Sequence, residues 1–127
     1  MAIRSHSTLA EVKEQLTEMP ALTAAETITP THQAHKVTLP EGADVNVDII
    51  TAGQPGQLLV LVADGTGTDK VVFRDTEVSG VATGANINIA AGTSTVEFDG
   101  ADDSAIFVYD GSKWVRINSL SVGADQS

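Results

Sequence analysis

The sequence predicts an all-β protein: an antiparallel β-sandwich or barrel of about eight short strands, preceded by a short N-terminal helix and an extended arm. Two observations support this fold class. From His35 onward, short apolar or alternating runs recur about every ten residues between turns that contain Gly, Pro or Asp. The five aromatic residues also fall late in the chain, so a packed core is expected in its C-terminal two-thirds. These residues are Phe73, Phe98, Phe107, Tyr109 and Trp114.

The N-terminal segment carries the one helical pattern. Thr8 followed by Glu11 matches a capping box. Apolar residues then recur at spacings of three and four, at Leu9, Val12, Leu16 and Met19. Pro20 ends the pattern, so a helix is predicted over 8–18. A helix this short is marginal alone in water and needs a surface, either its own β domain or a neighbouring subunit.

Residues 21–34 are rich in Thr and Ala and show no clear period. They are predicted to form an arm, either a flexible tail or a segment that lies over a partner. The predicted organisation is therefore a helix and arm over 1–34, a β domain over 35–120 and a C-terminal tail over 121–127. With 127 residues, the chain is long enough for one modest domain.

The predicted strands lie at 36–39, 45–50, 57–63, 70–74, 85–90, 94–98, 105–109 and 113–117. The run over 57–63 is continuously apolar, which predicts a strand buried on both faces. The strongest local prediction is a hairpin that joins 105–109 to 113–117 around Asp110-Gly111, because this pair tolerates the positive φ of a tight turn.

Composition excludes several classes of function. Seventeen acidic against seven basic residues give a formal charge of −10, which disfavours binding to nucleic acid and to anionic membranes. This charge suits a cationic or metal-bearing partner, but the favoured interpretation is that it keeps a β-rich protein soluble. The absence of cysteine excludes disulfides, thiolate metal sites and a cysteine nucleophile. No apolar run is long enough to span a membrane, and residues 1–10 lack the pattern of a signal peptide. The protein is expected to remain in the compartment where it is made, unless it leaves as part of an assembly.

Candidate chemical groups each have a simpler structural interpretation. His32 and His35 have a spacing that can bind zinc, but no cysteine or nearby carboxylate completes the site, so exposed arm residues are favoured. The Asp64–Asp69 stretch is similar to a calcium loop, yet its twelfth position is Asp75 where a glutamate is expected. Turn formation explains this stretch, and it also explains the cluster Asp99, Asp102 and Asp103 without a bound cation.

Catalytic motifs are missing from the sequence. There is no phosphate-binding loop and no Gly-x-Ser-x-Gly motif. Trp114 could stack on a sugar, but packing against Tyr109 across the predicted hairpin is favoured. No catalytic, cofactor-binding or metal-binding residue is therefore predicted, no cofactor is expected, and the protein is expected not to be an enzyme.

The order of turns and strands over 53–117 resembles a known style of domain. The stretches that carry the resemblance are GQPGQLLVLV, KVVFRD, GANINIAAG and AIFVYDGSKWVRI. This order resembles the small β domains of tailed-phage virion proteins, which include head decoration proteins and parts of fibres or spikes. The resemblance covers about half of the chain. It concerns turns and strands that determine the fold, so it transfers no binding residue.

The resemblance implies a capsid decoration (cement) protein of a bacteriophage. Such a protein would be a homotrimer that binds the major capsid protein at the capsid surface, and it would be made in the host cytoplasm. Two alternatives remain open. One is a tail fibre or spike tip, or a carbohydrate-binding receptor-recognition module, which would present an exposed aromatic such as Trp114. The other is a small acidic enzyme or metal-binding protein that uses the Asp-rich loops.

Overall fold

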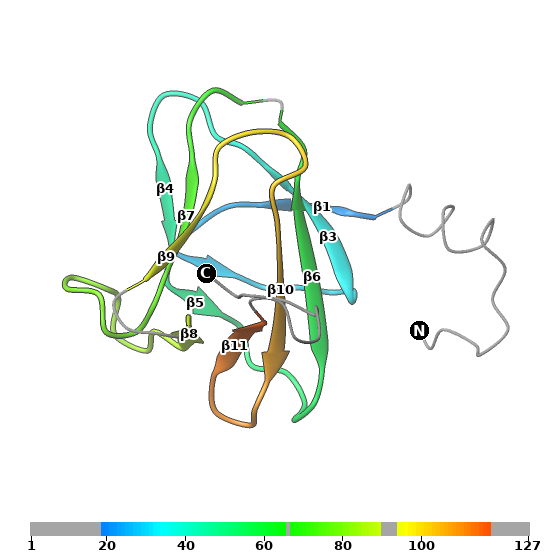
Figure 1. The fold of residues 1–127 in the computed structure, drawn as a ribbon, viewed down its shortest axis with the longest axis vertical. Coiled ribbons are helices and arrows are strands. Elements are labelled where there is room, and N and C mark those ends of the chain that lie inside the picture. The colour runs from blue at the N-terminus through cyan, green and yellow to red at the C-terminus, as the bar shows by residue number, and fades with distance from the viewer. Residues whose placement is uncertain (1–18, 66, 90–93, 118–127) are drawn as a thin grey trace, which may run out of the picture.

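The computed structural model describes residues 19–65, 67–89 and 94–117 and confirms the all-β class (Figure 1). The described residues form eleven strands, rather than about eight, and contain no helix. The helix predicted over 8–18 and the tail over 121–127 lie outside the described residues. The strands are β1 (Ala21–Thr23), β2 (Thr27–Ile28), β3 (Ala34–Thr38), β4 (Val45–Val47), β5 (Ile49–Ile50), β6 (Leu58–Ala63), β7 (Val71–Arg74), β8 (Ile87–Asn88), β9 (Thr95–Phe98), β10 (Ser104–Tyr109) and β11 (Trp114–Ile117).

The prediction of an antiparallel arrangement is wrong for most of the chain. The strands form a six-stranded sheet (β1-β3-β6-β10-β11-β8), a three-stranded sheet (β4-β7-β9) and a two-stranded sheet (β2-β5). Of the eight strand pairings, five are parallel and three are antiparallel. Successive strands of the N-terminal half go to different sheets, so the chain winds in a solenoid-like manner and each return is parallel. Only the later pairs β6–β10, β10–β11 and β7–β9 are antiparallel.

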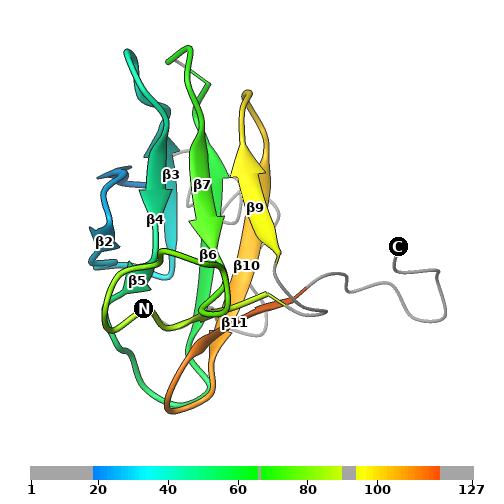
Figure 2. The same ribbon diagram turned by 90° about the vertical axis from the view of Figure 1, so that its left-hand side faces the viewer.

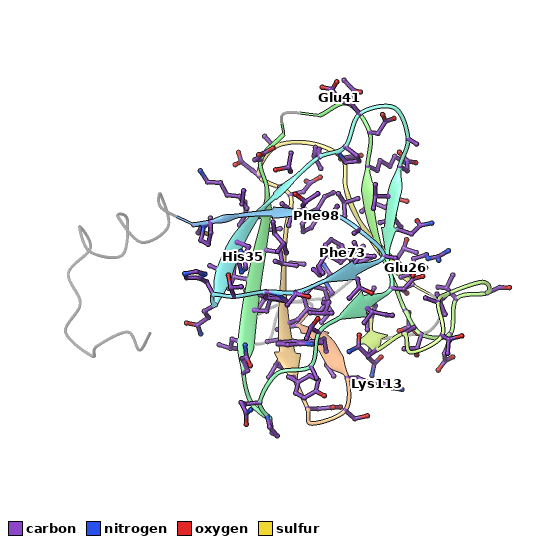
Figure 3. The ribbon with its side chains drawn as sticks, turned by 180° about the vertical axis from the view of Figure 1, so that it is seen from behind. Glu26, His35, Glu41, Phe73, Phe98 and Lys113 are labelled. Atoms are coloured by element: carbon purple, nitrogen blue, oxygen red, sulfur yellow. The ribbon has the colours of Figure 1, made fainter. Side chains whose placement is uncertain are left out.

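The core lies between the six-stranded and three-stranded sheets. Figure 2 shows β4, β7 and β9 in front of β3, β6 and β10. Phe73 of β7 packs between the layers beside Phe98, and Figure 3 labels both rings. The ring centroid of Phe73 lies 4.9 Å from that of Phe98 and 5.8 Å from that of Phe107. All five aromatic residues are buried, which confirms that they form the core.

The segment predicted as an arm, 21–34, is partly built into the sheets. β1 pairs in parallel with β3, and β2 pairs in parallel with β5. The side chain of Ile28 is only 2% exposed and belongs to the hydrophobic core. The sequence could not show this because neither short strand carries a period, and each is specified by its distant partner rather than by its own pattern.

The strand predicted over 45–50 is divided at Asp48. Val45–Val47 pairs with β7 in the three-stranded sheet, whereas Ile49–Ile50 pairs with β2. The Asp48 side chain is only 1% exposed. The chain therefore passes from one sheet to another at a buried carboxylate.

The predicted hairpin between β10 and β11 is confirmed. Tyr109 pairs with Trp114, and the four residues between them form the loop. Oδ1 of Asp110 accepts hydrogen bonds from the N–H groups of Ser112 (2.8 Å) and Lys113 (2.7 Å), and these bonds lower the pKa of Asp110. Gly111 follows with a φ of +102°, a conformation that favours glycine.

Strand β6, predicted to be buried on both faces, is fully buried on one. Leu59, Leu61 and Ala63 point into the core. The alternate residues Leu58, Val60 and Val62 face the other way and stay partly exposed, Leu58 at 38%. The prediction of complete burial is thus wrong for the outward face.

Within the described part of the chain, no helix has the length and apolar character needed to cross a membrane.

Candidate functional site

The two histidines predicted as possible zinc ligands do not face a common site. The His35 side chain is 1% exposed, and its Nε2 accepts hydrogen bonds from the backbone N–H groups of Thr31 (3.0 Å) and His32 (3.1 Å). Its Nδ1 lies 3.2 Å from the carbonyl oxygen of Pro20 and donates to it, so both ring nitrogens are engaged. His32 is exposed, with its Nδ1 2.9 Å from Oγ1 of Thr31. His35 therefore fixes the 29–33 turn to the start of β1.

A pH dependence of stability follows from this arrangement. Burial lowers the pKa of His35, so the unfolded chain takes up the proton first as the pH falls. Stability from neutral His35 is complete above its unfolded pKa of about 6.5 and is lost as the pH falls toward the lower folded pKa. We expect the urea midpoint to decline from pH 8 to pH 5. His35→Gln, which cannot titrate, should flatten the decline and His32→Gln should retain it; an equal decline in all three proteins would contradict the assignment.

The residues of the calcium-like stretch are separated in the structure. Asp75 is 2% exposed, and its carboxylate accepts hydrogen bonds from the N–H groups of Glu77 (2.8 Å) and Ile89 (2.6 Å). Oδ2 of Asp69 accepts from the N–H of Gly42 at 2.7 Å. Each carboxylate thus closes a different turn. Among the described residues, no group of three His, Cys, Asp or Glu could hold a metal ion.

The cluster of Asp99, Asp102 and Asp103 also forms a turn. Oδ2 of Asp103 accepts hydrogen bonds from the N–H groups of Asp99 (2.9 Å) and Gly100 (3.2 Å), and these bonds lower the pKa of Asp103. Asp102 has a φ of +73°, the left-handed conformation that Asp tolerates better than most residues. Turn formation therefore accounts for the cluster.

Three acidic loops meet at one end of the molecule, which we call the acidic end. They are the β3–β4, β6–β7 and β9–β10 loops, seen together at the top of Figure 1. Hydrogen bonds join them: Asp69 N–H to the Pro40 carbonyl (2.9 Å) and Asp102 N–H to the Ala63 carbonyl (3.2 Å). Their acidic residues are Glu41, Asp44, Asp64, Asp69, Asp99, Asp102 and Asp103.

The acidic end carries little compensating positive charge. The three loops contain one basic residue, Lys70, at the end of the β6–β7 loop. The Nζ of Lys70 is 3.2 Å from Oε1 of Glu97, so this lysine already has an acidic partner. Figure 3 shows Glu41 at this end and Lys113 at the opposite one. The sequence shows that acidic residues outnumber basic ones. That the acidic loops lie together at one end of the molecule is seen only in the structure.

Trp114 lies in the core rather than on a binding surface. Its side chain is 1% exposed, its ring centroid is 5.0 Å from that of Tyr109, and its Nε1 donates to the carbonyl oxygen of Thr51 at 3.2 Å. This confirms packing across the hairpin over ligand stacking.

A buried ion pair was missed by sequence reasoning. Nε and Nη2 of Arg74 each lie 2.7 Å from an oxygen of Asp48, in a bidentate geometry. Oδ2 of Asp48 also accepts the N–H of Ala82 at 2.9 Å. The hydrogen bond from Arg74 lowers the pKa of Asp48. The only sequence signal is a charged residue within the apolar run 45–50, whose partner lies 26 residues later.

Where β6, β10 and β11 lie side by side, most side chains on the outward side of the six-stranded sheet are apolar. The register aligns Val60 with Ile106 and Ile117, and aligns Leu58 with Val108 and Val115. These side chains are only partly covered. We call this surface the outer apolar face; it consists of Leu58, Val60, Val62, Ile106, Val108, Val115 and Ile117.

Comparisons with known proteins give no relative for this chain: no family model, curated protein or solved structure matches it.

Proposed function

We propose that this chain is a non-enzymatic structural protein of a virion, a capsid decoration (cement) protein that acts as a homotrimer. The observation that carries the proposal is how the polar side chains are used. His35, Asp75 and Asp103 bind backbone groups of the chain itself, and the buried Asp48 binds Arg74 and Ala82. The groups that the sequence offered for chemistry thus hold loops in place, which suits a scaffold. The resemblance of residues 53–117 to phage virion domains gives this scaffold its context.

The acidic end suits a protein partner with a basic surface. Seven carboxylates on three joined loops create a negative potential that repels phosphate groups of nucleic acids and lipids. The same potential would attract and orient a cationic patch on the major capsid protein. Three copies in a trimer would bind the shell with avidity, so each contact could be weak.

Sheet edges give a reason for self-association. β4 and β9 border the three-stranded sheet, and each pairs with β7 alone within that sheet. Open edges favour pairing with other chains, and a closed trimer would limit such contacts. The carbohydrate-binding alternative loses the residue on which it depended, because Trp114 is buried.

Solution mass tests the oligomer. Light scattering on a sizing column is expected to give three chains per particle, and a monomer at all concentrations would contradict the trimer. Deletion of residues 1–34 is a poor test of the N-terminal segment, because it would remove β1, β2 and the buried Ile28. A deletion that ends before Met19 leaves every described strand intact.

Co-sedimentation with shells of the cognate major capsid protein tests the partner. We expect the triple variant Glu41→Gln, Asp99→Asn, Asp102→Asn to bind roughly tenfold more weakly at low salt, because it removes three negative charges from the acidic end. Asparagine also tolerates the positive φ at position 102. The control Glu26→Gln, Glu77→Gln removes two negative charges at exposed positions elsewhere and should bind normally. Equal binding by the triple variant would contradict a role for the acidic end.

A further inference from the structure

We infer that His35 is a pH-sensitive switch: its protonation releases residues 20–33, which contain β1 and β2, while the three-stranded sheet and strands β6, β10 and β11 stay folded. Residues 20–33 are called the 20–33 segment below. The inference goes beyond the proposed function and does not depend on it, because it concerns a change of conformation within a single chain.

One side chain holds both ends of the 20–33 segment. The imidazole of His35, on β3 (Figure 3), is 1% exposed. Its Nδ1 donates to the carbonyl oxygen of Pro20 at the start of the segment (3.2 Å). Its Nε2 accepts from the N–H groups of Thr31 (3.0 Å) and His32 (3.1 Å) near the end. β1 and β2 lie between these two attachment points, so a single ring closes the segment into a loop.

Only a neutral His35 can make these contacts. With its hydrogen on Nδ1, the ring keeps a lone pair on Nε2, and this lone pair accepts the two backbone N–H groups. A second proton on Nε2 turns that atom into a donor that faces two other donors. Both hydrogen bonds to the 29–33 turn are then lost, whereas the bond from Nδ1 to Pro20 can persist. Release is therefore expected to begin at Thr31 and His32.

The surroundings of His35 offer no negative charge to an imidazolium. The adjacent strands β1 and β6 contain no charged residue, and β3 contributes the cation Lys36. The 29–33 turn contributes His32, whose ring centroid is 5.7 Å from that of His35, and a positive charge there disfavours a second one.

The direction of the pH effect follows from this environment. Burial lowers the pKa of His35, and the hydrogen bond to Pro20 opposes this change without reversing it. A released ring regains the ordinary pKa of about 6.5. As the pH falls through that value, the released form takes up a proton before the closed form does, so acid favours release.

The 20–33 segment is weakly held apart from this ring. β1 pairs with β3 through three residue pairs, and β2 pairs with β5 through two. Of the fully buried hydrophobic side chains in the described part of the chain, the segment contributes only Ile28. Elements with few such contacts open at a lower free energy than the whole domain, so release stays local. It would free one edge of β3 and one of β5 for pairing with another chain.

Amide hydrogen exchange followed by NMR on the full chain tests the inference. Rates measured at about pH 7.5 and about pH 5 are converted into protection factors, which correct for the intrinsic pH dependence of exchange. We expect roughly tenfold lower protection at the acidic pH for the amides of Thr31, Lys36 and Thr51, which bond to His35, Pro20 and Ile28. The Asp75 amide, which bonds to the Ser94 carbonyl beside β7 and β9, should keep its protection.

Two variants assign the effect to His35. His35→Gln cannot titrate, so the protection of the Thr31 amide should no longer depend on pH. His32→Gln, the matched control, leaves His35 in place and should keep the tenfold change. The ring nitrogen shifts of His35 give a direct readout, because at about pH 7.5 they should show the hydrogen on Nδ1.

Three results would overturn the inference. Equal loss of protection at Thr31 and Asp75 would show unfolding of the whole domain. Unchanged protection of Thr31 would show that acid does not release the segment. A hydrogen on Nε2 at about pH 7.5 would contradict the acceptor role. If His35→Gln does not fold, the comparison of amides within the natural protein still decides. None of these readouts uses capsid shells or particle mass, so a failure here is distinguishable from a failure of the proposed function.

Discussion

Replacing Phe73 by alanine is expected to lower the free energy of unfolding by about 3–5 kcal/mol, a large part of the about 5–15 kcal/mol that stabilises a typical domain. The Phe73 ring is fully buried and contacts Phe98 from the same sheet and Phe107 from the facing one. Its removal leaves a cavity between the layers that their strands cannot close. Urea unfolding followed by Trp114 fluorescence measures the effect.

The neighbouring residue provides the control. Val72 lies in the same strand and points outward, where it is only half-buried. Val72→Ala should cost less than about 1 kcal/mol because little apolar surface returns to water. Phe73→Leu should fall between the two variants. A loss for Phe73→Ala that is no larger than that for Val72→Ala would contradict the central place of this ring.

Local features of the fold could be predicted from the sequence. The β10–β11 hairpin depends on Asp110 and Gly111, which act within four residues of one another. The inward positions of β6 likewise follow from alternation along one strand. Features that depend on distant partners could not be predicted. The parallel pairs β1–β3, β3–β6 and β4–β7 join segments whose own patterns are equally compatible with antiparallel neighbours.

The candidate functional residues also divide into those that depend on local sequence and those that depend on distant partners. His32 and His35 are close in sequence, yet one is exposed and the other is buried and bound to the backbone. Asp69 and Asp75 were grouped by spacing, but they close turns in different places. The acidic end has the opposite character, since its carboxylates come from three separate loops. Spacing along the chain predicts a site only where all the groups lie on one local element.

For the outer apolar face, the sequence does contain a signal, the apolar run over 57–63, but the predicted reason for that run is wrong. The apolar run over 57–63 predicts burial on both faces, which is typical of a central parallel strand. In the structure only the face with Leu59 and Leu61 meets the core. The other face, with Leu58, Val60 and Val62, is only partly covered by the described residues.

The buried ion pair between Asp48 and Arg74 should behave differently from one on the surface. Asp48→Val is expected to cost about 2–3 kcal/mol, because it leaves the Arg74 guanidinium and the Ala82 N–H without their carboxylate. The value lies below the full cost of an isolated buried charge, since the Arg74 side chain is 20% exposed and can be partly hydrated. The double variant Asp48→Val, Arg74→Met should recover about 1–2 kcal/mol of that loss.

Lys70 and Glu97 form the matched control, because their side chains are 43% and 45% exposed and solvent screening should leave them only weakly coupled. Acid gives a second readout. The lowered pKa of Asp48 means that its contribution is complete above the unfolded pKa of about 3.9 and is lost as the pH falls through the lower folded value. Urea midpoints measured from pH 6 to pH 2 should therefore decline less steeply in Asp48→Val than in the natural protein. Arg74→Met alone completes the comparison of single and double variants. If the pH dependence of Asp48→Val equals that of the natural protein, and if the losses of the two single variants add up to the loss of the double variant, the ion pair does not stabilise the crossing between the sheets.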